Sequence, residues 1–171
     1  MTGHRDDPPV GHPACLGLGS DTDPSCHLRR ALAALRMADG IEVEAVSTAW
    51  ESPAVGRPGP DFLNAALLVR TRLSRDELKD RLVRIETDLG RVRTGGPSDP
   101  VTIDIDLLAF DAEPPAPDLW ALAHRSLPLA ELLPDLASPA TGETLAQSAR
   151  RLASATRIEP RPDVLPGRPP S

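Results

Sequence analysis

The stretch Leu73–Gly90, LSRDELKDRLVRIETDLG, decides the fold together with the segment that follows it, Val101–Phe110, VTIDIDLLAF. Ser74 and Glu77 have the spacing of a capping box, in which each side chain accepts a hydrogen bond from a free backbone N–H at a helix start. Four apolar residues then repeat at helical spacing and form one stripe: Leu78, Leu82, Ile85 and Leu89. Gly90 is typical of a C-terminal cap. We therefore expect an amphipathic helix between Ser74 and Gly90.

Strands are expected on both sides of this helix. Phe62–Thr71, which precedes it, is apolar enough for a central strand. In Val101–Phe110, which follows it, successive side chains of a strand point to opposite faces of the sheet. The two sets are Val101, Ile103, Ile105 and Leu107 on one face and Thr102, Asp104, Asp106 and Leu108 on the other. Ile41–Val46 alternates apolar with acidic residues, which predicts a half-buried strand.

The N-terminal part begins with a short apolar run that ends at Gly19-Ser20, consistent with a first strand. A helix should follow, with Asp23 as its N-cap and Pro24 at its first position. Its apolar residues repeat at helical spacing before Gly40: Leu28, Ala31, Leu32 and Leu35.

The order of elements is therefore β-α-β-β-α-β, which predicts an α+β, ferredoxin-like fold. This fold is an antiparallel sheet with both helices packed on one face. Short C-terminal helices are expected at Leu129–Leu133 and at Leu145–Leu152, the second after Thr141 as a cap with Glu143. We expect one domain at residues 14–156, between a disordered N-terminal tail (1–13) and a disordered, Pro-rich C-terminal tail (157–171).

Composition narrows the class of protein. The formal charge of -6 argues against broad nucleic-acid binding, which needs a basic surface. No apolar run approaches the length of a membrane span, and no secretory signal is apparent. Two cysteines, Cys15 and Cys26, have neither disulfide-framework nor metal-ligand spacing. We expect a cytoplasmic protein, a monomer or homodimer, that binds small molecules rather than nucleic acid or membranes.

Asp104 and Asp106 are the first candidate site. Two residues apart on a strand, their carboxylates project from the same face, roughly 7 Å apart at the backbone. A hard divalent cation such as Mg²⁺ binds carboxylate oxygens and substrate phosphates together. The alternative is that this face of the sheet is simply solvated at this point.

A basic pair, Arg91 and Arg93, follows the capped helix, which also carries Glu86. The two guanidinium groups are suited to bind phosphate oxygens, although solvated surface arginines are the simpler interpretation. One Gly/Pro-rich loop, Thr94 to Pro100, joins this pair to the acidic pair. A basic pair, a loop and an acidic pair are the parts that a triphosphate site needs.

The ordered motifs of the chain resemble those of 6-hydroxymethyl-7,8-dihydropterin pyrophosphokinases. Leu18-Gly19-Ser20 resembles the family's L-G-S-N; Ser52-Pro53-Ala54-Val55-Gly56 its T-x-P-x-G; and Asp61-Phe62-Leu63-Asn64-Ala65 its D-[FY]-L-N-A. The pattern I-E-x-x-x-G-R-x-R is matched by Ile85-Glu86 with Gly90-Arg91-Val92-Arg93. The pattern T-x-D-x-D is matched by Thr102-Ile103-Asp104-Ile105-Asp106, and P-L-x-E-[IL] by Pro128-Leu129-Ala130-Glu131-Leu132. The resemblance spans Leu16 to about Leu136.

The resemblance implies an enzyme of folate synthesis that transfers pyrophosphate from ATP to the pterin's hydroxymethyl group and releases AMP. It implies two Mg²⁺ ions at Asp104 and Asp106, with catalytic roles for these two and Arg91. Nucleotide-binding residues would be Glu86, Arg91, Arg93, Thr102 and Ile105. Pterin-binding residues would be Ser52, Pro53, Val55, Phe62 and Asn64. The chemistry of Phe62 and Asn64 suits a flat heterocycle with an amide-like edge, since one offers a ring face and the other a donor and an acceptor.

The chain departs from the family pattern at two places. Where the family has R-W-G-P-R before T-x-D-x-D, this sequence has Pro97-Ser98-Asp99-Pro100-Val101. The later His and Arg of the family fall near Ala116 and Leu122, and His124-Arg125 fits neither place without a shift. Two alternatives to the standard reaction follow: a divergent paralogue with another substrate, or a non-catalytic binding module on the same fold.

Overall fold

The computed structural model describes residues 10–168. It has a five-stranded sheet in the order β4-β1-β3-β2-β5, in which every neighbouring pair is antiparallel. The strands are β1 (His12–Ser20), β2 (Ile41–Ser52), β3 (Phe62–Thr71), β4 (Asp104–Phe110) and β5 (Glu159–Arg168); the helices are α1 (Pro24–Met37), α2 (Arg75–Asp88), the 3-10 helix η1 (Pro117–Trp120), α3 (Ala123–Leu132) and α4 (Leu145–Ala155). The predicted βαββαβ order and α+β ferredoxin-like fold are confirmed.

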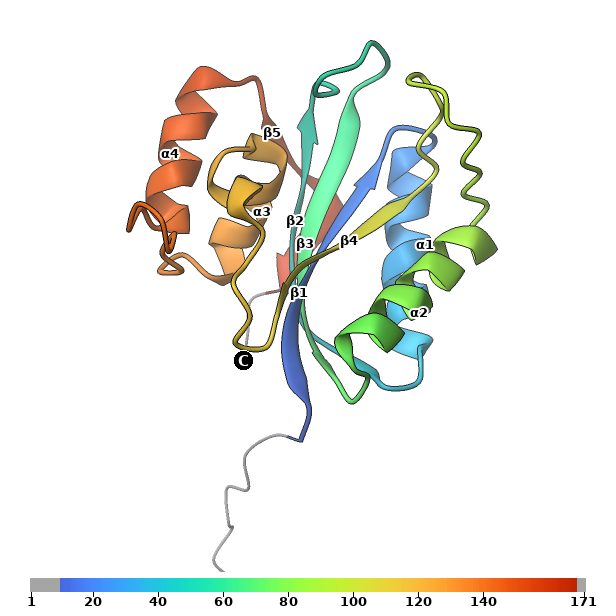
Figure 1. The fold of residues 1–171 in the computed structure, drawn as a ribbon. Helices are drawn as coiled ribbons and strands as arrows, with labels where there is room; N and C mark the ends of the chain where they lie inside the picture. The colour runs from blue at the N-terminus through green and yellow to red at the C-terminus, as the bar shows by residue number, and fades with distance from the viewer. Residues whose placement is uncertain (1–9, 169–171) are drawn as a thin grey trace, which may run out of the picture.

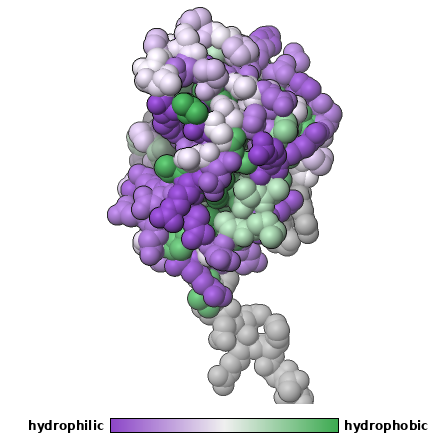
Figure 2. Space-filling model, turned by 90° about the vertical axis from the view of Figure 1, so that its right-hand side faces the viewer, coloured by the Kyte–Doolittle hydropathy of each residue, from purple (hydrophilic) through white to green (hydrophobic). Residues whose placement is uncertain are grey.

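Helices cover both faces of the sheet (Figure 1). Helices α1 and α2 pack on one face, as predicted for the two helices of the repeat, and the surface over them is mostly hydrophilic (Figure 2). Helix α3 lies against the other face, and α4 packs on α3. A second cluster of buried side chains joins them to the sheet: Cys15, Ala45, Ala66, Leu108, Leu119, Trp120, Leu129, Leu132 and Leu145. The C-terminal helices therefore leave only part of that face open.

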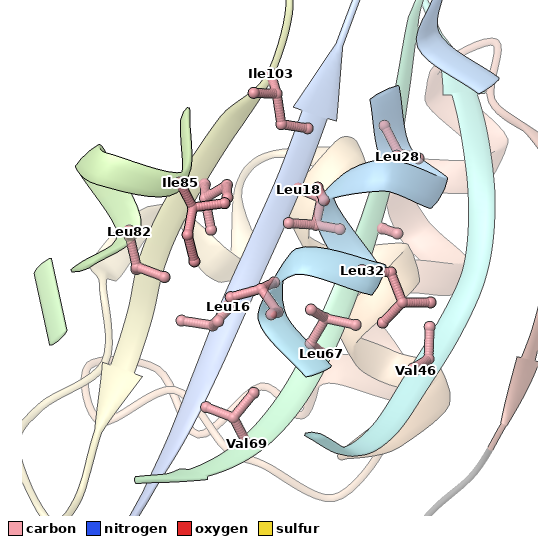
Figure 3. Packing of buried hydrophobic residues seen from close by; sticks show 14 of the residues in the cluster. Leu16, Leu18, Leu28, Leu32, Val46, Leu67, Val69, Leu82, Ile85 and Ile103 are labelled. Atoms are coloured by element: carbon pink, nitrogen blue, oxygen red, sulfur yellow. The ribbon is translucent and has the colours of Figure 1, made fainter. Parts of the chain in front are cut away.

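The main core lies between the sheet and α1–α2 (Figure 3). Leu16 and Leu18 of β1 and Leu67 of β3 point into it, against Leu28 and Leu32 of α1. Helix α2 and the residues before β4 complete it with Leu82, Ile85 and Ile103. The apolar stripes expected from helical spacing are thus buried. Among the described residues, every helix is too short or too polar to cross a membrane.

The helix caps only partly follow the predictions. The capping box of α2 is confirmed, since the Glu77 N–H donates to Ser74 Oγ at 3.3 Å and the Ser74 N–H donates to Glu77 Oε2 at 2.8 Å. Asp23 is the N-cap of α1, but its backbone is left-handed and its side chain makes no capping bond. The cap of α4 is Thr144, with Gln147 as its partner, so the predicted cap at Thr141 was wrong.

The expected disordered C-terminal tail was wrong for residues 159–168, which form β5 and pair with β2. Prolines suggested a loop, but an edge strand tolerates a missing N–H on its outer side. Val164 and Leu165 are buried in the main core, and Arg29 of α1 donates to the carbonyl oxygens of Asp163 and Val164. At the other end β1 begins at His12, inside the expected N-terminal tail. Residues 1–9 and 169–171 of the two tails lie outside the described part of the chain.

The C-terminal strand should contribute to stability. Replacement of Leu165 by alanine is expected to lower the free energy of unfolding by about 2–4 kcal/mol, because it removes buried methyl groups from the core. Urea denaturation followed by circular dichroism measures this. The control is Asp163→Ala, which removes an exposed ion pair with Arg161 and should change stability by less than about 1 kcal/mol. If both substitutions changed the free energy of unfolding by a negligible amount, this result would contradict the packing of β5 against the core.

Candidate active site

Two glycines of β1 form the floor of a cleft at one end of the sheet. Gly19 pairs with Asp104 on one side and Asn64 on the other, and Gly17 pairs with Asp106 and Ala66. A Cβ atom at Gly19 would lie 3.0 Å from Asn64 Oδ1. A Cβ atom at Gly17 would lie 3.2 Å from a methyl carbon of Leu108. The missing side chains leave open the space between the acidic pair and β3.

The cleft has a volume of about 290 Å³ and contains residues from five separate segments. It is lined by both aspartates and by all five residues expected at the acceptor site: Asp104, Asp106, Ser52, Pro53, Val55, Phe62 and Asn64. Asn64 is buried, and its Nδ2 donates to Ser52 Oγ at 3.3 Å. The structure thus brings together the predicted metal-binding pair and the predicted acceptor residues, which are 40 or more positions apart in the sequence.

Asp104 and Asp106 have partly exposed side chains, at 37% and 44%. Burial raises the pKa of Asp106, and the neighbouring charge of Asp104 raises it further. The described residues contain no group of three or more His, Cys, Asp or Glu side chains that would hold a metal ion. Two carboxylates still fit Mg²⁺, because this ion is usually held by one or two carboxylates together with substrate phosphates and water.

Glu86 is buried beside the acidic pair and links β4 to Arg93. Its Oε1 accepts a hydrogen bond from the Ile105 N–H at 2.7 Å, and its Oε2 accepts one from Arg93 Nη2 at 2.9 Å. Burial raises the pKa of Glu86, and the two donors oppose this rise. Arg93 also lies 3.5 Å from Asp104 Oδ1. Glu86 therefore fixes β4 and holds the Arg93 guanidinium near the acidic pair.

Arg91 has two buried guanidinium atoms, Nε and Nη1, without a hydrogen-bond partner among the described residues. A buried donor without an acceptor is costly, so this group suits an anionic ligand. None of the five expected nucleotide-binding residues is among those that line the cleft. Ile105 points into the core on the opposite face, and its N–H is already bonded to Glu86. Thr102 supplies its carbonyl oxygen to Ser20 Oγ at 2.7 Å.

Arg57 lines the cleft, although in the sequence it is only a lone arginine in a Pro/Gly loop. Its Nη2 donates to Asp21 Oδ2 at 2.6 Å and its Nη1 to the Asp99 carbonyl oxygen at 2.9 Å. The guanidinium carbon also lies 5.6 Å from the centre of the Phe62 ring. Asp21 is buried and accepts the Val101 N–H at 2.7 Å. Arg57 therefore ties the loop after β2 to the loop before β4.

The loop before β4 is organised by Asp99, where the family pattern has other residues. The Asp99 carboxylate accepts hydrogen bonds from the Thr94 N–H, the Thr94 hydroxyl and the Gly96 N–H. These donors lower the pKa of Asp99. The Asp99 carboxylate therefore holds the loop from Thr94 to Asp99 in its conformation.

The start of helix α3 supplies the remaining wall, with the N-cap residue Leu122 and with His124 and Arg125. Arg125 Nη1 donates to both carboxylate oxygens of Asp118, at 2.8 and 2.9 Å, and Nη2 donates to Asp106 Oδ2 at 3.0 Å. Burial lowers the pKa of His124. His124 and Arg125 fitted no family position in the sequence, yet both face the cleft.

Fold and cleft together define the class of this protein: a ferredoxin-like α+β protein whose sheet carries an acidic pair beside an apolar slot. The chain belongs to the 7,8-dihydro-6-hydroxymethylpterin-pyrophosphokinase (HPPK) family, whose model matches residues 15–134.

Three relatives are each named 2-amino-4-hydroxy-6-hydroxymethyldihydropteridine pyrophosphokinase. The protein of Synechocystis sp. is 35% identical over 153 residues, which cover 83% of this chain and 77% of the relative. That of Methylorubrum extorquens is 36% identical over 151 residues, covering 81% and 92%. That of Bacillus subtilis is 32% identical over 152 residues, covering 81% and 89%.

The Asp21–Arg57 pair should be energetically coupled. A double-mutant cycle with Asp21→Asn and Arg57→Ala is expected to give a coupling of about 1–3 kcal/mol in the free energy of unfolding. The reason is that loss of one partner leaves the other without the opposite charge that balances it. Chemical denaturation of the four proteins measures it. The exposed pair Arg75–Glu113 is the comparison and should give less than about 1 kcal/mol. Equal coupling energies for the Asp21–Arg57 and Arg75–Glu113 pairs would contradict the strong coupling of Asp21 to Arg57.

Proposed function

We propose that the protein transfers the β,γ-pyrophosphoryl group of ATP to the hydroxymethyl group of a dihydropterin, the activity named for its relatives. One observation carries the proposal: five residues suited to a flat acceptor and two carboxylates suited to Mg²⁺ line the same cleft. Neither a solvated surface nor an unrelated binding module requires these two sets of residues to meet. We place the reaction in the cytoplasm, because two free cysteines fit a reducing compartment.

The acceptor would lie in the slot formed by Ser52, Phe62 and Asn64. Phe62 offers a ring face for stacking, and the buried amide of Asn64 offers a donor and an acceptor to the edge of the heterocycle. Gly17 and Gly19 keep the floor open, so the acceptor's hydroxymethyl group can approach the acidic pair. Positioning of this kind supplies a large part of the rate in phosphoryl transfer.

The nucleotide would lie on the other side of the acidic pair, toward Arg91 and Arg93. Asp104 and Asp106 would hold Mg²⁺, which neutralises phosphate charge when bound. In the transfer, the acceptor's hydroxyl oxygen bonds to the β-phosphorus and the bond from that phosphorus to the α,β-bridging oxygen breaks. The bond's electron pair leaves with AMP, and the hydroxyl proton passes to water. Little covalent chemistry falls to the protein, so charge and position decide the rate.

Loss of the acidic pair should abolish the reaction. Asp104→Asn and Asp106→Asn are each expected to reduce AMP release from ATP and 6-hydroxymethyl-7,8-dihydropterin by at least about 100-fold, because each removes a charged metal ligand. Chromatography of AMP at fixed Mg²⁺ measures the rate. Asp111→Asn is the control: this residue has a left-handed backbone that asparagine tolerates, and it should retain activity. Absence of AMP release from the unmodified protein at high concentration would refute the proposed function.

Phe62 should act on the acceptor alone. Phe62→Ala is expected to raise the KM for the dihydropterin by about 10-fold, since stacking of an aromatic side chain on a heterocycle contributes about 1–3 kcal/mol. The KM for ATP should stay within about twofold. Initial rates at varied concentrations of each substrate separate the two. An equal rise in both values would instead indicate a general disturbance of the cleft, and an unchanged acceptor KM would favour an acceptor bound elsewhere.

A further inference from the structure

Arg125 lines the cleft beside the acidic pair and the expected acceptor residues. The pyrophosphoryl group carries several negative charges and moves from the nucleotide side of the acidic pair to the acceptor side. Arg91 and Arg93 are on the nucleotide side, beside Glu86. Two arginines line the cleft that contains the acceptor residues, namely Arg57 and Arg125.

Arg57 uses both of its terminal nitrogens to hold the protein together, and its buried Nε has no hydrogen-bond partner among the described residues. Its Nη2 is bonded to Asp21, whose side chain is only 1% exposed, and its Nη1 is bonded to a backbone carbonyl oxygen. Withdrawal of Arg57 would leave a buried carboxylate without its cation, which is unfavourable. Arg57 is therefore poorly placed to follow a substrate phosphate.

Arg125 has a different arrangement. Both oxygens of Asp118 hold its Nη1, so one edge of the guanidinium is anchored to η1. The other edge, Nη2, reaches Asp106 Oδ2 at 3.0 Å and is directed at the acidic pair. Asp106 is partly exposed, so release of this single contact does not strand a buried charge. The planar fork of arginine suits phosphate oxygens at such a position.

We propose that Arg125, anchored by Asp118, binds the pyrophosphoryl group on the acceptor side of the acidic pair and neutralises its charge during transfer. This inference rests on the proposed function. It assigns to helix α3 a phosphate contact that the sequence motifs did not indicate. It also accounts for a phosphate site in a chain whose loop at Pro97–Val101 contains no arginine.

Arg125→Met tests the inference, because methionine keeps the length of the side chain and removes its charge and donors. With Mg²⁺ present, kcat/KM is expected to fall by about 10- to 100-fold. Calorimetry should show weaker binding of α,β-methylene-ATP, which retains the pyrophosphoryl group, by about 10-fold. The affinity for AMP, which lacks that group, should stay within about twofold. Arg125→Lys should recover part of the loss, since it keeps the charge without the fork.

Arg75→Ala is the matched control, because it removes an arginine from an exposed ion pair with Glu113 and should change neither quantity. Thermal unfolding verifies that each variant is folded. If Arg125→Met is not folded, the activity and analogue binding of Arg125→Lys test the inference instead. Unchanged kcat/KM and analogue binding, with half-maximal activity at a lower Mg²⁺ concentration, would overturn the inference and leave Arg125 as a mere counterion of Asp106. Absence of AMP release from the unmodified protein would refute the function instead, and analogue binding would still test Arg125.

Discussion

The inner strand β1, which pairs with both β3 and β4, imposes the constraint on which the structure depends. On one face, Leu16 and Leu18 are buried against the helices. On the other face, Gly17 and Gly19 carry no side chains beside Asp104 and Asp106. Because side chains alternate along a strand, a shift of one residue in register would exchange the two sets. The core and the cleft are therefore fixed by the same pairing of β1 with β3 and β4.

Charge balance around the cleft depends on partners from distant segments. Arg93 follows α2 and lies beside Asp104, while Arg125 from α3 contacts Asp106. Arg57, from the loop after β2, is paired with Asp21, which follows β1. The first contact closes the loop between α2 and β4, and the other two join segments that are 19 and 36 residues apart in the chain. The electrostatic arrangement thus depends on the complete fold, and partial assembly would leave carboxylates beside one another without cations.

The sequence was sufficient for the order of the first six elements, for the cap of α2 and for seven of the residues that line the cleft, because each depends on local spacing or on a motif. It was insufficient for β5, whose prolines suggest a loop until the partner strand is known. The roles of Arg57 and Arg125 were also out of reach, since their partners are 36 and 19 residues away. The cap of α4 was misplaced by three residues, because Thr141 and Thr144 both precede the helix and only Thr144 has Gln147 three residues later.

Because the floor of the cleft consists of Gly17 and Gly19, substitutions can change the cleft only at its walls. Glycine at positions 17 and 19 contributes shape but no chemical preference, and any larger residue there would meet Leu108 or Asn64. The chemical character of the cleft comes instead from its walls, which are formed by the loop after β2 and by the start of helix α3. Substitutions in those walls can alter which molecule fits without any change in strand pairing. In this protein the base of the cleft is therefore fixed by strand pairing and packing, whereas the residues of its walls can be exchanged.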